Sequence, residues 1–205
     1  MQQVLLPLFP LQVVLLPGSE LPLHIFEDRY KEMIGEVLRD KIEFGVVLAS
    51  EKGIVNTGCT ATVARVLREY GDGRLDILTV GRRRFEILLV NDERSFLRGA
   101  VEFFDDDEAQ PAAPDVLEKA IEGYNALQAV SSDDPLSSTE AADPQLSFRL
   151  ARPVSDLAFR QMLLATRNEA DRIRQVAEFL PDFVVRARRI QSLKDAAPRN
   201  GFRPH

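Results

Sequence analysis

The chain has 205 residues, of which 45% are hydrophobic and 28% are charged, and this supplies enough core for one large or two small folded domains. The composition excludes collagen-like, fibrous and wholly disordered chains. The formal net charge of -6 argues against a general nucleic-acid binder, because such proteins carry a positive field.

Residues 1–17 contain no charged side chain. Such an apolar N-terminal stretch resembles an export signal or a short membrane anchor. However, no Lys or Arg precedes the apolar run, and Pro7, Pro10 and Pro17 would break the helix that both roles require. We therefore expect extended strands here and no membrane association. The single cysteine, Cys59, favours a reducing, cytoplasmic compartment.

Charge is distributed unevenly along the chain. Residues 1–101 carry 13 basic and 14 acidic side chains, residues 102–143 carry 1 basic and 12 acidic ones, and residues 144–205 carry 12 basic and 6 acidic ones. Such shifts often mark domain boundaries, and the acidic, proline-bearing stretch at 105–115 is typical of a linker. We therefore expect one domain over 1–108 and another over 109–205.

The first block has the pattern of short strands. Residues 60–70 alternate at period two, Gly71-Asp72-Gly73 follows, and residues 74–80 alternate again, which predicts a β-hairpin. Gly81 then precedes another predicted strand in which Phe85, Ile87 and Leu89 share one face. Residues 43–50 and the proline-rich start add the remaining expected strands.

One segment of this block has helical spacing. Its apolar residues recur at intervals of three and four, which predicts a helix over 27–39; they are Phe26, Tyr30, Met33, Ile34, Val37 and Leu38. About six strands with one helix indicate a small, partly closed β barrel.

The second block is predicted to be helical, so the fold class is α+β. Val116 to Leu127 has the spacing of a first helix, and residues 131–144 have the composition of a mobile polar loop. We expect Ser155 to cap the next helix and Asn168 to begin the last one. Pro181 should kink or restart that helix, and residues 196–205 should be frayed.

Catalytic groups are scarce. Nucleophilic catalysis usually needs a histidine base, and the chain has only the terminal His205 and His24. We expect His24 to be partly buried and satisfied by a backbone group, because no carboxylate neighbours it in the sequence. Cys59 alternates with Ala61 and Val63, as a small core residue does. These patterns predict no catalytic residue and no enzyme.

Metal and cofactor sites are likewise not predicted. One cysteine and two histidines cannot close a structural zinc site, and the acidic run at 105–108 lacks the glycine and spaced oxygens of a calcium loop. No phosphate-binding glycine loop precedes a helix. We therefore expect no bound metal or cofactor.

Arg82, Arg83 and Arg84 stand out beside a predicted turn. Guanidinium groups bind phosphate in a bidentate manner, so one interpretation is an anion or RNA contact. The other is that strand alternation sends Arg82 and Arg84 to one face and Arg83 to the opposite face, where they pair with nearby acids. The acidic net charge favours the second interpretation.

Several segments resemble the Lon protease N-terminal domain family. They are LPLFPLQVVLLPGSELPLHIFEDRYKEMI at 6–34, EFGVVL at 43–48, GCTATVARV at 58–66 and VGRRRFEI at 80–87, which match the family's motifs in order. The resemblance implies a PUA-like barrel followed by a helical block. It indicates a stand-alone member without the ATPase and protease modules of Lon, and hence a non-catalytic protein.

The resemblance also implies a role in recognising polypeptides. The expected ligands are unfolded or tagged chains, with a protease partner and self-association as further interactions that the family allows, and with nucleic acid disfavoured by charge. Recognition of unfolded chains needs an accessible apolar groove with a polar rim. The candidates for it are Phe9, Pro10, Phe26 and Tyr30, although amphipathic stripes usually bury such residues in the core.

Overall fold

The computed structural model describes residues 5–51, 53–107 and 111–196. These residues belong to two compact units: unit 1 comprises 1–108 and 154–167, and unit 2 comprises 109–153 and 168–205. The sequence suggested a single boundary near residue 108, whereas the chain returns to unit 1 for residues 154–167. Of the tail expected to be frayed at 196–205, residues 197–205 lie outside the described residues.

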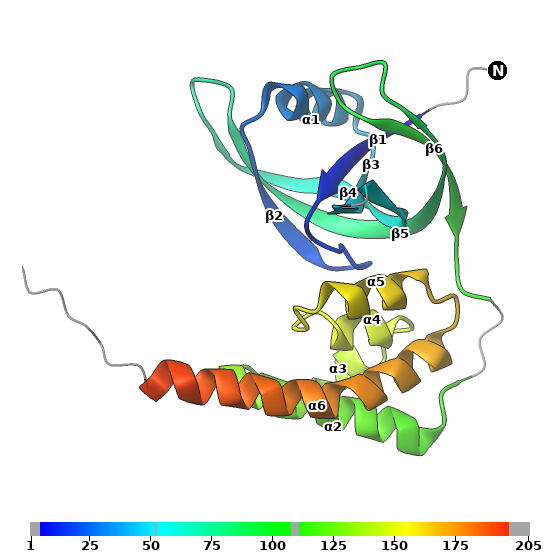
Figure 1. The fold of residues 1–205 in the computed structure, drawn as a ribbon, viewed down its shortest axis with the longest axis vertical. Coiled ribbons are helices and arrows are strands. Elements are labelled where there is room, and N and C mark those ends of the chain that lie inside the picture. Colours follow the sequence, from blue (N-terminus) through cyan, green and yellow to red (C-terminus); the bar gives the residue numbers. More distant parts are fainter. Residues whose placement is uncertain (1–4, 52, 108–110, 197–205) are drawn as a thin grey trace, which may run out of the picture. The chain divides into compact units, whose positions relative to one another are not determined.

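Unit 1 is built on a six-stranded sheet in the order β2-β5-β4-β3-β1-β6. The strands are β1 (Leu6–Leu11), β2 (Glu20–Ile25), β3 (Phe44–Ser50), β4 (Gly53–Glu69), β5 (Leu75–Asn91) and β6 (Arg98–Phe104). An additional pairing between β5 and β6 closes five of the strands into a ring, while β2 pairs with β5 outside it. Figure 1 shows these strands curving around one another. The expected α+β class with a β barrel is confirmed.

Strand β5 is continuous through Gly81, where the sequence analysis expected two strands. A Cβ at this position would lie 2.4 Å from the carbonyl oxygen of Leu16. The amide of Gly18 donates to the carbonyl of Gly81 at 3.0 Å, and the amide of Gly81 donates to Ser19 at 2.9 Å. Glycine is therefore needed for close backbone approach and not for a turn.

A β-bulge changes the expected face of β5. The register against β6 shifts between Ile87 and Leu89, and a bulge adds a residue that breaks strict alternation. Phe85 is fully buried, but Leu89 is 64% exposed. The prediction that Leu89 shares one face with Phe85 is therefore wrong.

The barrel core is organised around one aromatic ring. Phe85 packs with Leu8 and Val47, all nearly inaccessible to solvent. Two glycines allow the neighbouring strands to approach the ring, because a Cβ on Gly45 or Gly58 would lie 2.6 or 2.5 Å from the Phe85 Cζ atom. Phe85, Leu8 and Val47 thus form a tightly packed part of the barrel core.

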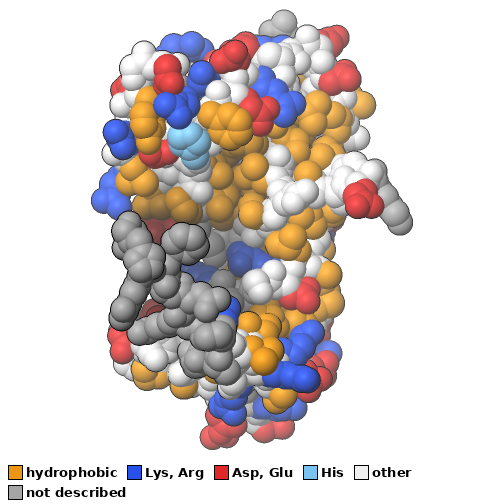
Figure 2. Space-filling view, turned by 60° about the vertical axis from the view of Figure 1, so that its left-hand side comes forward, with side chains coloured by type: hydrophobic (Ala, Val, Ile, Leu, Met, Phe, Trp, Pro, Cys, Tyr) orange, Lys and Arg blue, Asp and Glu red, His pale blue; other side chains and the backbone are white. Residues whose placement is uncertain are grey.

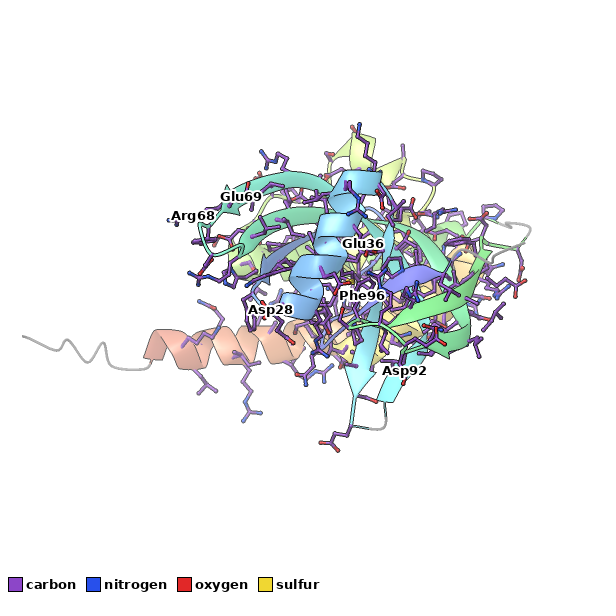
Figure 3. All side chains as sticks on the ribbon, turned by 90° about the horizontal axis from the view of Figure 1, so that it is seen from above. Asp28, Glu36, Arg68, Glu69, Asp92 and Phe96 are labelled. Atoms are coloured by element: carbon purple, nitrogen blue, oxygen red, sulfur yellow. The ribbon has the colours of Figure 1, made fainter. Side chains whose placement is uncertain are left out.

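Helix α1 (Asp28–Asp40) confirms the helix expected over 27–39. It buries Tyr30, Met33, Ile34 and Val37 of the apolar stripe, whereas Leu38 of the same stripe is 36% exposed. The loop after β5 holds the helix through Arg94, which binds Glu36 and stacks 4.9 Å from the Phe96 ring centre. Figure 3 labels Glu36 on α1 and Phe96 in the segment that follows β5.

Helix α5 (Leu157–Ala165) belongs to unit 1. Its N-cap is Asp156, whose carboxylate accepts from the amide of Phe159 at 2.9 Å, so the expected cap at Ser155 is off by one residue. The Gln161 side chain donates to the carbonyl of Thr57 at 3.0 Å and so ties α5 to β4.

Unit 2 is helical, as expected. Its helices are α2 (Pro114–Ser131), α3 (Ser138–Ala141), α4 (Leu146–Leu150) and α6 (Glu169–Ala196). Asn168 precedes α6 and accepts from the amide of Asp171 at 3.1 Å, as the sequence predicted. Helix α6 continues through Pro181, and Leu180 and Val184 on either side of it are buried. The expected restart is wrong, and the expected kink stays a prediction.

The short helix α4 was not expected and is attached to α6 by a buried arginine. The Arg172 guanidinium is inaccessible to solvent, donates to Ser147 Oγ at 2.9 Å and to Glu169 at 2.6 Å, and lies 4.4 Å from the Phe148 ring centre. A buried charge of this kind needs such partners.

The segment expected as a polar loop at 131–144 contains helix α3. The amide of Leu136 donates to Asn125 at 2.9 Å, and Ser137 donates to Glu140 at 2.8 Å. Its expected mobility stays a prediction. Within the described residues, none of the helices combines the length and apolar character needed to cross a membrane.

Candidate functional site

Four of the candidate residues line the same pocket in unit 1. The pocket has a volume of about 190 Å³ and is lined by residues 9–11 of β1, residues 23–27 from β2 onward, and residues 29–30 of α1. Phe9, Pro10, Phe26 and Tyr30 are all among them. We call this site the aromatic pocket.

The aromatic rings of the pocket differ in burial. Phe9 and Tyr30 are 5% and 8% exposed, and their ring centres are 4.1 Å apart. Phe26 is 58% exposed and stacks on His24 with ring centres 5.8 Å apart. The sequence allowed these residues to be either groove residues or core residues. Phe9 and Tyr30 are core residues that form the inner wall of the pocket, and Phe26 forms its exposed rim.

The rim also carries charge. The Arg29 guanidinium lies 4.5 Å from the Tyr30 ring centre and 2.7 Å from the Glu27 carboxylate. Burial raises the pKa of Tyr30 above its ordinary value, and the Arg29 charge partly opposes that shift. Tyr30 is therefore neutral at physiological pH and offers an apolar ring to a ligand. Figure 2 shows hydrophobic side chains gathered on the face that carries the histidine, among acidic and basic groups.

His24 is exposed, with 45% of its side chain accessible, and it has a carboxylate partner. The prediction of a partly buried His24 satisfied by a backbone group is therefore wrong. The Nδ1 atom of His24 lies 2.5 Å from Oδ1 of Asp76, and the Tyr70 hydroxyl donates to Oδ2 of the same carboxylate at 2.8 Å. Bonds from His24 and Tyr70 lower the pKa of Asp76, while its bond to Asp76 raises the pKa of Tyr70. The carboxylate thus orients the imidazole at the pocket's edge.

The sequence missed this pair because it depends on strand pairing. His24 lies directly opposite Asp76 in the register of β2 against β5. The two residues are 52 positions apart, and alternation within each strand does not reveal which strands are neighbours. No local motif signals the pair.

The three arginines have separate environments. Arg82 donates to the Thr62 hydroxyl at 3.0 Å, and Arg83 binds the Glu43 carboxylate at 3.0 Å. Arg84 is 3% exposed. Arg82 and Arg84 therefore do not share a face, because the register between β4 and β5 shifts between Cys59 and Ala61, opposite this run.

Arg84 is held inside unit 1. Its guanidinium binds Asp106 at 2.5 Å and donates to the carbonyl of Thr166 at 2.7 Å, and it lies 4.7 Å from the Phe104 ring centre. Asp106, which the sequence placed in a solvated linker, therefore has a structural ion pair. Arg84 is not presented to a phosphate ligand in this arrangement.

A second pocket in unit 1 includes Arg83. It has a volume of about 370 Å³ and is lined by residues 5–7, 42–43, Arg83, Val101 and Phe103. Arg83 lies 3.9 Å from the Phe103 ring centre while it binds Glu43, so its charge is already paired.

In the described part of the chain, no three His, Cys, Asp or Glu side chains gather where they could hold a metal ion. Cys59 is fully buried, and burial raises its pKa to about 12. It is a protonated core thiol, as the strand pattern indicated.

Comparison with known proteins decides the family. A family model described as the ATP-dependent protease La (LON) substrate-binding domain matches residues 5–182. The chain belongs to the Lon substrate-binding domain family. The matched domain is the non-catalytic, substrate-binding part of Lon, so the expected family is confirmed.

Two curated relatives of this Lon-family chain are named as Lon proteases. Lon protease from Parabacteroides distasonis is 31% identical over 110 residues, which cover 49% of this chain and 13% of that protein. Lon protease 1 from Hydrogenovibrio crunogenus is 27% identical over 140 residues, or 62% of this chain and 17% of that protein. The chain thus spans less than a fifth of the length of these relatives.

Solved structures show the same fold. The crystal structure of a Lon N-terminal domain protein from Xanthomonas campestris has a TM-score of 0.69 and 23% identity, and the match covers 86% of this chain and 98% of that one. The N-terminal domain of Mycobacterium avium complex Lon protease has a TM-score of 0.61 and 18% identity, with 87% and 99% covered.

Proposed function

We propose that this chain binds unfolded or tagged polypeptides through the aromatic pocket, without catalysing a reaction on them. The observation that supports this most directly is the convergence of Phe9, Pro10, Phe26 and Tyr30 on one pocket. Membership of a substrate-binding family gives the class of ligand. An unfolded client exposes apolar side chains that have no apolar partner. Partly accessible aromatic side chains beside a small cavity can provide that partner.

The chemistry of the rim suits clients of varied sequence. Glu27 and Arg29 form an ion pair at 2.7 Å and so neutralise each other's charge. Neither acidic nor basic clients are therefore strongly repelled. Buried Phe9 and Tyr30 keep the inner wall fixed, while exposed Phe26 supplies contact area without a large change in the core. Such a site fits an adaptor or accessory of a protease, which presents polypeptides for degradation.

Polypeptide binding can be tested with labelled, permanently unfolded casein. Fluorescence anisotropy should show saturable binding to the wild-type protein that persists at high salt, because apolar contact is not screened. Phe26→Ala should raise Kd about tenfold, since about 1.5 kcal/mol of apolar burial is lost. Its thermal stability should change little, because Phe26 is 58% exposed.

A matched control uses the other exposed phenylalanine of unit 1. Phe103 is 42% exposed and lies in the second pocket, so Phe103→Ala should leave Kd within about twofold if the aromatic pocket is the site. A loss of binding in Phe103→Ala alone would transfer the site to the second pocket. No saturable binding by folded wild-type protein would refute polypeptide binding.

RNA binding through Arg82, Arg83 and Arg84 is the weaker proposal. Arg83 and Arg84 already bind carboxylates, so a phosphate would have to displace Glu43 or Asp106. Structured RNA should therefore give no salt-sensitive gel shift. A shift that weakens with salt and is lost in Arg82→Glu would reverse the order of the two proposals.

A further inference from the structure

Two strands that line the aromatic pocket each have an edge without a neighbouring strand in the described part of the chain. Strand β2 stands at the end of the sheet order and pairs with β5 alone. In β1, residues 8–11 pair with β3, whereas β6 reaches only Leu6 and Pro7. An open edge normally offers backbone donors and acceptors to an added strand.

The open edge of β1 carries a proline at its outward position. The amide of Leu8 points away from β3, because it donates to the carbonyl of Leu97 at 2.8 Å. Backbone groups alternate in direction along a strand, so the residue two positions on, Pro10, also faces away from β3. Pro10 has no amide hydrogen, and the donor of Leu8 is already used.

The open edge of β2 carries a second proline in the same role. Its six residues pair with β5 without a register shift, and the Thr79 hydroxyl donates to the Leu21 carbonyl at 2.8 Å. That bond indicates that the Leu21 carbonyl faces β5, so the next residue, Pro22, faces outward. A proline is tolerated in a strand at such an outward position, where no ladder bond is lost.

We propose that the aromatic pocket binds an aromatic or aliphatic side chain of a client whose backbone does not join the sheet, because Pro10 and Pro22 prevent strand addition at both edges. The inference rests on the proposed polypeptide-binding function and specifies its mode. An incoming strand beside β1 would find neither the Leu8 amide nor an amide at Pro10. An incoming strand beside β2 would find no backbone amide donor at Pro22.

This arrangement has a consequence for unfolded clients. Such chains contain apolar, strand-forming segments that extend any accessible sheet edge. Because the client backbone cannot pair with β1 or β2 beside the pocket, binding depends on the client's side chains. Such binding remains reversible. The pocket can then hold an exposed side chain without starting an intermolecular sheet.

The test compares two modifications of one labelled peptide, which has a single central Phe among Ser, Thr and Gln. One derivative replaces Phe by Ala, and the other is N-methylated at the residues flanking Phe; a peptide N-methylated near its end is the control. The wild-type protein should bind the N-methylated peptides within about twofold of the parent, and the Ala peptide at least about tenfold more weakly.

The protein variant Pro10→Val/Pro22→Thr restores both amides. With this variant, methylation beside Phe should weaken binding about tenfold, as expected for the loss of two backbone hydrogen bonds. Weakening of that size in the wild type would overturn the side-chain mode and leave polypeptide binding intact. Equal binding of methylated and parent peptides by the double variant would overturn the role of the prolines. Absence of any binding by the folded wild type would refute the underlying function.

Discussion

The Nδ1 atom of His24 lies 2.5 Å from the Oδ1 atom of Asp76, and this contact joins β2 to β5 at the rim of the aromatic pocket. Tyr70 donates to the second carboxylate oxygen at 2.8 Å, and Arg68 and Arg74 lie 4.5 and 4.8 Å from the Tyr70 ring centre. Figure 3 shows Arg68 and the adjacent Glu69 at the outer end of the β4–β5 hairpin. The pocket rim is therefore attached to that hairpin through side chains.

The Asp76 carboxylate should make stability depend on acid pH. Its pKa is lowered from 3.8 by bonds from His24 and Tyr70. A carboxyl whose folded pKa lies below its unfolded pKa stabilises the fold above the unfolded value, and this contribution disappears as pH falls through the folded pKa. Urea unfolding should therefore show wild type more stable than Asp76→Asn at pH 7, with the difference shrinking below pH 3.8. A difference that is independent of pH would contradict this assignment.

The buried ion pair of Arg84 should be important for unit 1. Arg84→Ala removes the buried ion pair with Asp106 and the bond to the Thr166 carbonyl, which should lower the free energy of unfolding by about 3–5 kcal/mol. The matched control is Arg82→Ala, which removes an exposed guanidinium bound to Thr62 and should change stability by about 0.5 kcal/mol or less. Chemical denaturation measures both. Equal effects of the two substitutions would show that burial does not distinguish these arginines.

Two glycine substitutions should act in opposite directions. In Gly58→Ala the new Cβ would lie 2.5 Å from Phe85 Cζ and 2.7 Å from the Val46 carbonyl oxygen, so overpacking should destabilise the barrel by about 1–3 kcal/mol. Gly35 lies inside α1 with nothing within 4 Å of an added Cβ, and Gly35→Ala should stabilise the protein by about 0.5–1 kcal/mol. Thermal melts of the two variants check the signs. Destabilisation by Gly35→Ala would count against the exposed position of that residue.

Cys59 should be unreactive in the folded protein. Burial removes the thiol from solvent and raises its pKa to about 12, and the thiolate is the reactive form. Labelling by a thiol reagent at pH 8 should be slow in buffer and rapid in denaturant. Rapid labelling with the native circular dichroism signal retained would show that β4 opens locally around this residue.

Some features of the fold follow from local pattern and could be predicted. The apolar spacing of Tyr30, Met33 and Val37 specifies the buried face of α1, and the Asn168 side chain marks the beginning of α6. These features involve residues within a few turns of one another, so propensity and periodicity suffice.

Other features could not be predicted from the sequence because they depend on pairing between distant segments. Leu89 is exposed and Arg84 is buried because register shifts occur in the pairings of β5 with its neighbours. A bulge is created by the two strands together, and alternation read along β5 alone cannot locate it. Helix α5 has the amphipathic pattern of the other C-terminal helices, yet it belongs to unit 1.

The sequence by itself determined the family, the α+β class and the aromatic residues of the candidate pocket, since these reside in motifs and in local periodicity. Only the tertiary structure decided that Phe9, Phe26 and Tyr30 line one pocket, that Asp76 orients His24, and that Pro10 and Pro22 face the two open edges. The physical reason is that strand order and register are selected by burial of the whole sheet. Residues far apart in the chain come together in one site only when the strand order and register are established.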